Sequence, residues 1–268
     1  MVGARGGRLP ANRPSHPASR RRVLPIPGHV TAEAEAESRS DAGDTATTRI
    51  TIDAGFGCRD LEQRIVRFAP GRSHSRGGGA REELLFVVSG RGSLLLDGEE
   101  HPLEPETGAY VAPGARYELE NAGPDDLVLV SVLALEPDGG RSRGDRPRAT
   151  IRLADQEAFP AGRDREFRFG VDAETVTQFV GSIPPGRALP HYHEYEEVAY
   201  ILGGEGMLHI GGERTRVEPG SCIHFPPREP HILENVGGET LRVLGVFHPA
   251  GDPSAAYNIA ESEWEETQ

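Results

Sequence analysis

The sequence contains no lysine, and all 29 basic residues in its 268 positions are arginine. Arginine neither forms a Schiff base nor loses its proton, so enzymes that need a lysine nucleophile or a lysine general base are excluded. The two cysteines, Cys58 and Cys222, lie in different halves without CxxC spacing, which excludes a disulfide framework and a thiolate metal cluster. Such sparse cysteine fits a reducing compartment, and we expect a cytoplasmic protein.

Long apolar runs and an excess of positive charge are also missing. No apolar stretch approaches the roughly 20 residues of a membrane-spanning helix, and the mean hydropathy is -0.47. The formal net charge of -13 gives no cationic field that would attract phosphates. We therefore expect no nucleic-acid partner and no membrane partner, and a small molecule as the ligand.

Composition divides the chain into five parts. Residues 1–48 are rich in proline, glycine, serine and alanine, which predicts a disordered tail. Residues 49–137 and 151–255 consist of short β-branched runs separated by turn residues, which is typical of all-β sandwiches and barrels. The charged, glycine-rich residues 138–150 read as a linker, and residues 256–268 as an acidic tail.

The two β-rich parts are repeats of each other. The segment REELLFVVSGRG at residues 81–92 aligns with YEEVAYILGGEG at 195–206, an offset of 114 positions. The same offset joins further pairs of turn and strand residues, such as Gly90 with Gly204 and Asn121 with Asn235. The chain is therefore predicted to be a tandem duplication of one β domain.

Four potential metal ligands lie in the second repeat. In an extended strand His191, His193 and Glu197 point to the same side, because successive side chains alternate between faces. A hairpin would bring His231 back against them. Three imidazoles and one carboxylate suit a divalent Mn, Fe, Co, Ni, Cu or Zn ion better than Ca or Mg. Positions left open on such an ion indicate a catalytic rather than a structural site.

These residues resemble the two motifs of the cupin superfamily. The first motif, G-x5-H-x-H-x3,4-E-x6-G, matches residues 186–204 with one residue fewer before His191. The second, G-x5-P-x-G-x2-H-x3-N, matches residues 220–235 with Arg228 in place of a glycine. The resemblance spans about residues 50–250. It implies an all-β bicupin, two tandem double-stranded β-helix (jelly-roll) barrels, with the four donors as ligands of one metal ion.

The first repeat departs from this pattern. At the 114 offset Gly77, Gly79 and Tyr117 replace the three histidines, and only Glu83 matches a ligand. We therefore predict a metal-free N-terminal barrel that serves packing, dimerisation or binding of an uncharged ligand. The alternative is a degenerate site built from His74, Glu83 and Tyr117.

Other residues near the motifs are weaker candidates. Three polar residues are candidates for catalysis, as hydrogen-bond acceptors or proton carriers beside the ligands: Glu194, Glu196 and Gln178. Four residues are candidates for the pocket wall: Tyr200, Phe179, Phe225 and His224. The competing interpretations are a solvated surface for the charges, the core for the aromatic rings, and the outer face of the barrel for the histidine.

The resemblance implies a mononuclear metal enzyme that acts on a small organic molecule. Ring-cleaving dioxygenation, oxalate-type decarboxylation, sugar-phosphate isomerisation and ureidoglycine hydrolysis all remain open. The alternative is a non-catalytic bicupin that binds or senses a small ligand, whereas a storage globulin would ordinarily lack the complete ligand set. The resemblance also allows a homodimer, because cupins commonly pair through exposed strand edges.

Overall fold

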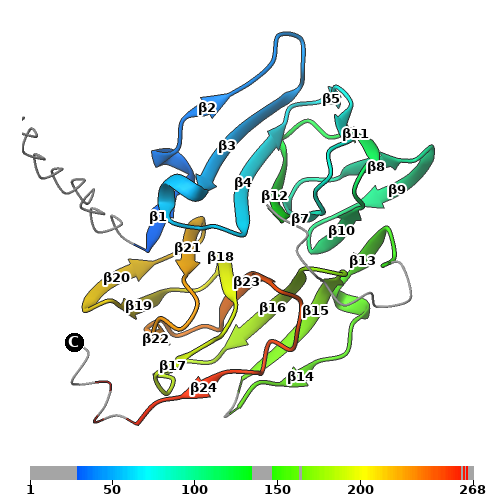
Figure 1. The fold of residues 1–268 in the computed structure, drawn as a ribbon. Coiled ribbons are helices and arrows are strands. Elements are labelled where there is room, and N and C mark those ends of the chain that lie inside the picture. The colour runs from blue at the N-terminus through cyan, green and yellow to red at the C-terminus, as the bar shows by residue number, and fades with distance from the viewer. Residues whose placement is uncertain (1–28, 135–146, 163–164, 261, 263, 265–268) are drawn as a thin grey trace, which may run out of the picture.

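The computed structural model describes residues 29–134, 147–162, 165–260, 262 and 264. These residues form two β barrels in tandem, with helix limited to short pieces, so the all-β bicupin prediction is confirmed (Figure 1). None of the helices in these residues has the length and apolar character that crossing a membrane requires. The short 3-10 helices are η1 (Glu33–Glu35), η2 (Ala54–Phe56) and η3 (Leu153–Asp155).

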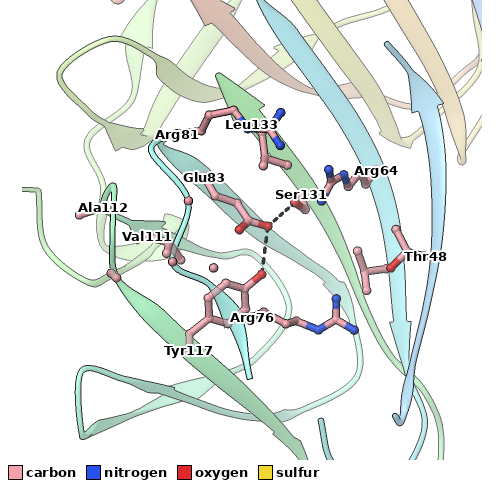
Figure 2. Close-up of a pocket in the computed structure, with 15 residues that line it drawn as sticks. Thr48, Arg64, Arg76, Arg81, Glu83, Val111, Ala112, Tyr117, Ser131 and Leu133 are labelled. Atoms are coloured by element: carbon pink, nitrogen blue, oxygen red, sulfur yellow. Dashed lines mark hydrogen bonds between the residues drawn. The ribbon is translucent and has the colours of Figure 1, made fainter. Parts of the chain in front are cut away.

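The first barrel consists of a seven-stranded sheet, β13-β10-β7-β12-β4-β3-β2, and a five-stranded one, β5-β11-β8-β9 with β6 on β11. Its own core lies between these sheets, next to a cavity at Glu83 (Figure 2). The strands are β2 (Ser38–Arg39), β3 (Ala46–Ile52), β4 (Leu61–Phe68), β5 (Gly71–Arg72), β6 (Arg76–Gly77), β7 (Glu83–Ser89), β8 (Gly92–Leu96), β9 (Glu99–Leu103), β10 (Thr107–Val111), β11 (Arg116–Asn121), β12 (Leu127–Ala134) and β13 (Thr150–Arg152).

The second barrel repeats this plan, with sheets β1-β21-β18-β23-β16-β15-β14 and β20-β19-β22-β17-β24. The strands are β1 (Val30–Ala32), β14 (Phe159–Pro160), β15 (Glu166–Asp172), β16 (Thr177–Ile183), β17 (His191–Tyr192), β18 (Glu196–Gly203), β19 (Gly206–Ile210), β20 (Glu213–Val217), β21 (Ser221–Phe225), β22 (His231–Asn235), β23 (Leu241–His248) and β24 (Tyr257–Asn258).

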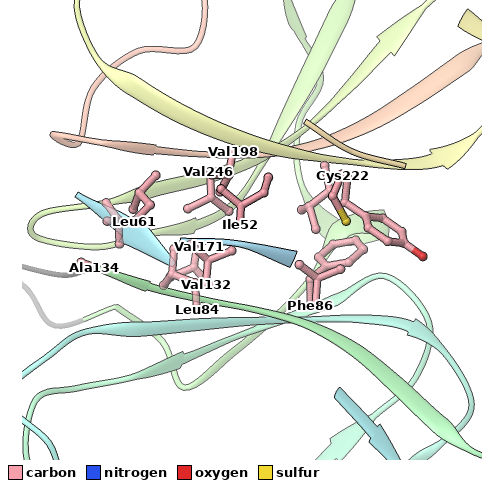
Figure 3. Close-up of a cluster of buried hydrophobic side chains, with 14 of the residues drawn as sticks. Ile52, Leu61, Leu84, Phe86, Val132, Ala134, Val171, Val198, Cys222 and Val246 are labelled. Carbon is pink, nitrogen blue, oxygen red and sulfur yellow. The ribbon is translucent and has the colours of Figure 1, made fainter. Parts of the chain in front are cut away.

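The large sheets of the two barrels pack against each other and enclose a third core (Figure 3). Along β18, Ala199 and Ile201 point into the second barrel, whereas Val198 and Tyr200 point toward the first. Both faces of the strand are therefore buried, which explains its nearly continuous apolar sequence. The position of a residue on one face or the other decides whether it lies in a barrel or between the barrels.

Each large sheet gains one strand from a distant part of the chain. Strand β1 pairs with β21 of the second barrel, and β13 pairs with β10 of the first. The boundary of the predicted tail is therefore wrong for residues 29–48, which contain β1, η1, β2 and the start of β3. Residues 1–28 of that tail and 138–146 of the predicted linker lie outside the described residues, while Thr150 belongs to β13 and not to a linker.

The predicted acidic tail also begins with ordered structure. In β24, Asn258 and Tyr257 pair with the two residues of β17, and the Tyr257 ring stacks on Tyr192 with centroids 5.2 Å apart. Trp264 is only 4% exposed. Residues 257 and 258 thus belong to the second barrel. The error arises because a two-strand pairing at a sheet edge depends on backbone hydrogen bonds, which composition does not reveal.

Two buried carboxylates join the barrels in a reciprocal way. The Glu82 carboxylate of the first barrel accepts a hydrogen bond from the backbone N–H of Thr175 in the second, at 3.1 Å. In return the Glu196 carboxylate accepts one from the N–H of Asp60, at 2.7 Å. Glu82 and Glu196 are separated by the repeat offset of 114 positions, so the two bonds are equivalent.

Two glutamines repeat this exchange. Gln63 Nε2 donates to the carbonyl oxygen of Ala199 at 3.2 Å, and Gln178 Nε2 donates to that of Leu85 at 3.4 Å. The glutamines are 115 positions apart because the first repeat has one more residue in the following loop. The interface between the barrels therefore has approximate twofold symmetry.

The segment after β1 is attached to the first barrel by Glu33. Its carboxylate accepts two hydrogen bonds from Arg67, both 2.6 Å long, and one from Arg49 at 3.1 Å. The bonds from Arg67 hold the pKa of Glu33 below its ordinary value of 4.5. Residues 29–39 thus connect a strand in one barrel to side chains of the other.

We expect Glu33→Gln to lower the free energy of unfolding by about 1 kcal/mol at pH 7, since the paired groups keep partial contact with solvent. A folded-state pKa below the unfolded one stabilises the protein fully above about pH 4.5 and progressively less as the pH falls through the folded value. Urea unfolding should show the variant and the parent converging in acid. Glu37→Gln is the control, because its pair with Arg39 is 3.7 Å long and exposed; an equal loss there would contradict this role.

Candidate functional site

Three histidines meet inside the second barrel. Strand β17 pairs with β22 so that His191 lies directly opposite His231, and His193 follows two residues later. One ring nitrogen of each of these three residues lies within 4.8 Å of the others. The ring centroids of His191 and His193 are 4.5 and 4.8 Å from that of His231. Two stretches about 40 residues apart in sequence therefore contribute to one cluster.

Backbone contacts orient two of the rings. The Nδ1 of His191 is 3.0 Å from the carbonyl oxygen of Leu189, and that of His231 is 2.9 Å from the carbonyl oxygen of Glu229. A carbonyl oxygen only accepts hydrogen bonds, so each Nδ1 carries the proton. The Nε2 of each neutral ring then has a free lone pair that can bind a metal ion. This arrangement is usual for histidines that ligate metals.

Glu197 lies beside His193, although the group of ligand atoms within 4.8 Å of one another consists of the three histidines. The Nδ1 of His193 is buried and has no hydrogen-bond partner in the described residues. Glu197 Oε2 is 3.6 Å from this nitrogen, beyond hydrogen-bonding distance. An unsatisfied buried nitrogen beside a buried carboxylate is costly unless a further group joins them.

Burial keeps the three rings neutral. It lowers the pKa of His193 to about 3, with further lowering by His191. Burial and the two neighbouring imidazoles hold the pKa of His231 well below its ordinary value, and burial also lowers that of His191. Burial raises the pKa of Glu197 to about 8. Neutral imidazoles are the form that ligates metals, and a bound cation would favour ionisation of the carboxyl.

The turn before His231 is attached to the loop of His193. The backbone N–H of Arg228 donates to the carbonyl oxygen of His193 at 2.7 Å, and its side chain pairs with Glu194 at 2.6 Å. Arg228 has φ of 63°, in the left-handed region that favours glycine. The turn therefore keeps the conformation of the glycine in the cupin motif although the residue differs.

A cavity of about 430 Å³ opens onto the histidine cluster. Its wall includes Phe179 and Phe225, as well as Tyr195, whose ring stacks on His193 with centroids 4.5 Å apart. Two arginines also line it. Arg165 donates to the carbonyl oxygen of Leu233 at 3.3 Å and forms no ion pair with a described carboxylate. The cavity thus combines an aromatic wall with an unneutralised guanidinium group.

Sequence reasoning missed these arginines, Arg165 and Arg187, and also Gly245. A Cβ at position 245 would lie 2.3 Å from the Phe179 ring and 2.7 Å from Glu197 Oε1. Only glycine allows both side chains to occupy this space. The sequence signal for Gly245 is weak, because a single glycine inside an apolar strand is compatible with a β-bulge as well as with side chains packed closely against the backbone. Neither arginine belongs to a motif, so no sequence signal distinguished them.

Four predicted site residues lie elsewhere. Tyr200 packs in the core between the barrels. Glu196, Gln178 and His224 contact the first barrel or one another, and none of the four lines the cavity. Their assignment to the site is corrected for the same reason: each points to the face opposite that of the metal-ligand candidates. Glu194, the remaining candidate for catalysis, is exposed and paired with Arg228.

Glu196, His224 and Cys58 form a second cluster between the barrels, with one potential ligand atom of each within 4.8 Å. His224 Nε2 is 3.0 Å from Glu196 Oε1, and the backbone N–H groups of Arg59 and Asp60 donate to the same carboxylate. Burial raises the pKa of Glu196, but the bonds from His224 and Asp60 outweigh it and the pKa is lowered. With its oxygens filled, the carboxylate works as a hydrogen-bond acceptor.

The first barrel has no equivalent histidine cluster among its described residues. Tyr117 donates a hydrogen bond to Glu83 at 3.0 Å where the second barrel has His231 and Glu197. A Cβ at Gly77 would lie 2.4 Å from the carbonyl oxygen of Ala115, so a side chain at that position requires a different backbone. His74 is exposed and does not line the cavity, contrary to the alternative of a degenerate site.

The family described as the cupin domain matches this chain twice, at residues 64–133 and 179–247. The chain belongs to the cupin family. Its curated relatives include an oxalate-binding protein of Thermotoga maritima, 38% identical over 67 residues, and an uncharacterized protein of Methanocaldococcus jannaschii, 38% identical over 69 residues. These matches cover 24% and 25% of this cupin and 55% of each relative, so the chain spans about half the length of the curated relatives.

Two solved structures share the fold of this bicupin. The protein YlbA from E. coli has a TM-score of 0.70 at 16% identity, over 83% of this chain and 91% of the other. Oxalate decarboxylase from Bacillus subtilis has a TM-score of 0.68 at 12% identity, over 89% of this chain and 82% of the other. At these identities the likeness concerns the arrangement of the two barrels.

Proposed function

We propose that the second barrel binds one divalent transition metal ion through His191, His193, His231 and Glu197. The observation that carries the proposal is the cluster of three ring nitrogens within 4.8 Å, together with the buried His193 Nδ1, which has no hydrogen-bond partner in the part of the chain that the structure describes. The donor set of imidazoles and a carboxylate suits Mn, Fe, Co, Ni, Cu or Zn. A bound ion of this kind would supply a Lewis acid with open positions for a substrate oxygen.

We further propose that the protein is a metal-dependent enzyme whose substrate is a small organic acid. Arg165 lines the cavity without an ion pair to any carboxylate of the described residues, and its guanidinium can donate to a carboxylate through two N–H groups. The rings of Phe179 and Phe225 give the same space an apolar wall. The oxalate-binding relative supports a dicarboxylate such as oxalate as the first compound to test.

A second candidate function is binding without turnover. Besides Glu197, the only carboxylate among the described residues that line the cavity is Glu166, which is exposed. An enzyme would use Glu166, Tyr195 or a water molecule for proton transfer. The name of the oxalate-binding relative also favours this alternative.

Oxalate should raise the melting temperature of the metal-loaded protein clearly more than that of the metal-free protein. Arg165→Gln should weaken oxalate binding about tenfold or more, because it removes a charge-assisted pair, while the metal content stays the same. Arg168→Gln is the matched control, since Arg168 bonds to the carbonyl oxygen of Gln156 outside the cavity lining. Equal weakening by both variants would contradict the role of Arg165.

Turnover is measured in the same samples. Formation of formate and carbon dioxide from oxalate, or uptake of dioxygen with catechols or flavonols, would support the enzyme. Tight binding of oxalate without any product over hours would contradict the enzyme and support the function of binding without turnover.

A further inference from the structure

The cavity of the first barrel differs in charge from the rest of the molecule. It has a volume of about 280 Å³ and occupies the place that corresponds to the histidine cluster of the second barrel. Its lining, among the described residues, contains three arginines, Arg64, Arg76 and Arg81, and a single carboxylate, Glu83. The whole chain has a formal charge of -13, so this local excess of positive charge is unusual.

The arginines are only partly neutralised by their surroundings. Arg64 and Arg81 share one carboxylate, Glu62, and the contact of Arg81 with it is 3.9 Å long. Arg76 pairs with Asp44 through one terminal nitrogen at 2.5 Å, while its Nε is buried and has no hydrogen-bond partner among the described residues. Each guanidinium has five N–H groups, so several donors remain for another anion.

The carboxylate of Glu83 lies among these groups (Figure 2). Its Oε1 accepts hydrogen bonds from Tyr117 at 3.0 Å and from Ser131 at 2.6 Å. No described residue donates to its Oε2, so an acceptor remains for a ligand. A carboxylate of the ligand would be repelled by Glu83 and drawn toward the arginines, whereas a hydroxyl would be bound by Glu83.

A glycine segment lines this cavity and places no side chains in it. Residues 77 to 79 are three consecutive glycines, and a Cβ at Gly77 would collide with the carbonyl oxygen of Ala115. This part of the wall therefore presents peptide groups instead of side chains. In the second barrel the equivalent stretch contributes two histidines, which explains why the cavities differ in chemistry.

We propose that the first barrel is a second ligand site, which binds a small hydroxy acid between Arg64, Arg76 and Arg81 on one side and Glu83 on the other. The three guanidinium groups in the lining favour an anion over the uncharged ligand that the sequence led us to expect in this barrel. The site is independent of the metal and of the function proposed for the second barrel.

The test is titration calorimetry with L-malate and with succinate, which lacks the hydroxyl. The full chain carrying His231→Ala is used, so that binding near the proposed metal does not contribute. Malate should bind with one site per chain and about tenfold more tightly than succinate, because Glu83 accepts a hydrogen bond only from malate. Equal binding of the two acids, or no binding of malate, would overturn the proposal.

Two variants in the same background locate the site. Arg76→Gln and Arg81→Gln should each weaken malate binding about tenfold or more. If Arg76→Gln does not fold, Arg81→Gln still tests the site. The ion pair of Arg81 with Glu62 is 3.9 Å long, so we expect its removal to cost little stability. Arg91→Gln is the control, because Arg91 pairs with Glu104 outside this cavity. Malate binding that persists in both cavity variants would place the ligand elsewhere and refute the assignment.

Discussion

His193→Ala should leave the purified protein almost free of metal, whereas the parent protein should carry close to one transition metal ion per chain. The imidazole of His193 is buried, neutral and without a partner in the described residues, so its removal takes away a ligand and nothing else that is bonded to it. Loss of a group that merely supports a ligand costs 10- to 100-fold in metal affinity, so loss of a ligand should cost at least about 100-fold. Elemental analysis and competition with a chelator measure the two quantities.

Two other histidines provide controls for this experiment. His209 is buried in the same barrel but bonds to Glu234 at 3.0 Å, and His74 lies exposed on the first barrel. His209→Ala and His74→Ala should both retain the metal. If His74→Ala emptied the protein of metal while His193→Ala did not, the metal would belong to the first barrel and the proposed function would be wrong.

The histidine cluster was predictable from two local features. Two histidines separated by one residue share a face in an extended chain, and the segment before His231 reads as a hairpin that returns the chain toward them. The structure brings His191 and His231 into direct register across two strands. The absence of such a cluster from the described part of the first barrel follows equally from the glycines at positions 77 and 79.

The other candidates failed because alternation says which residues share a face but not which face lines the cavity. Along β21, Phe225 and Ile223 point into the barrel while His224 and Cys222 point toward its partner barrel. Both faces are buried, so neither burial nor polarity distinguishes them in the sequence. Polar residues such as His224 are tolerated between the barrels because a carboxylate satisfies them.

Comparison of the two repeats indicates the role of Glu196 and Gln178 in packing the barrels. Glu196 and Gln178 have equivalents in the first barrel, Glu82 and Gln63, although that barrel lacks the histidines. A polar residue that both repeats keep, when only one keeps the ligands, indicates a role that both barrels share. Packing of the two barrels is such a role. The pairing of β1 with β21, by contrast, joins positions almost 200 residues apart, and nothing in the local composition predicts it.

Glu196→Gln should lower the free energy of unfolding by about 2–4 kcal/mol while metal content and oxalate binding remain unchanged. The carboxylate accepts hydrogen bonds from two backbone N–H groups of the first barrel and from His224. An amide has only one accepting oxygen, and its NH2 would face another donor, so at least one buried N–H would be left without a partner. Urea unfolding measures the loss, and elemental analysis and calorimetry measure the two quantities expected to stay constant.

Glu82→Gln is the matched variant, because Glu82 makes the equivalent bonds to Thr175 from the barrel that has no histidine cluster in its described residues. A role in joining the barrels predicts similar losses of stability for both variants, since the two interactions are related by the repeat. A role of Glu196 in proton transfer predicts instead that its variant alone loses turnover, with stability nearly intact. Glu196 precedes the proposed ligand Glu197, and Glu82 precedes Glu83 at the equivalent position of the first repeat. Comparing the two variants therefore shows whether Glu196 holds the barrels together or acts on a substrate.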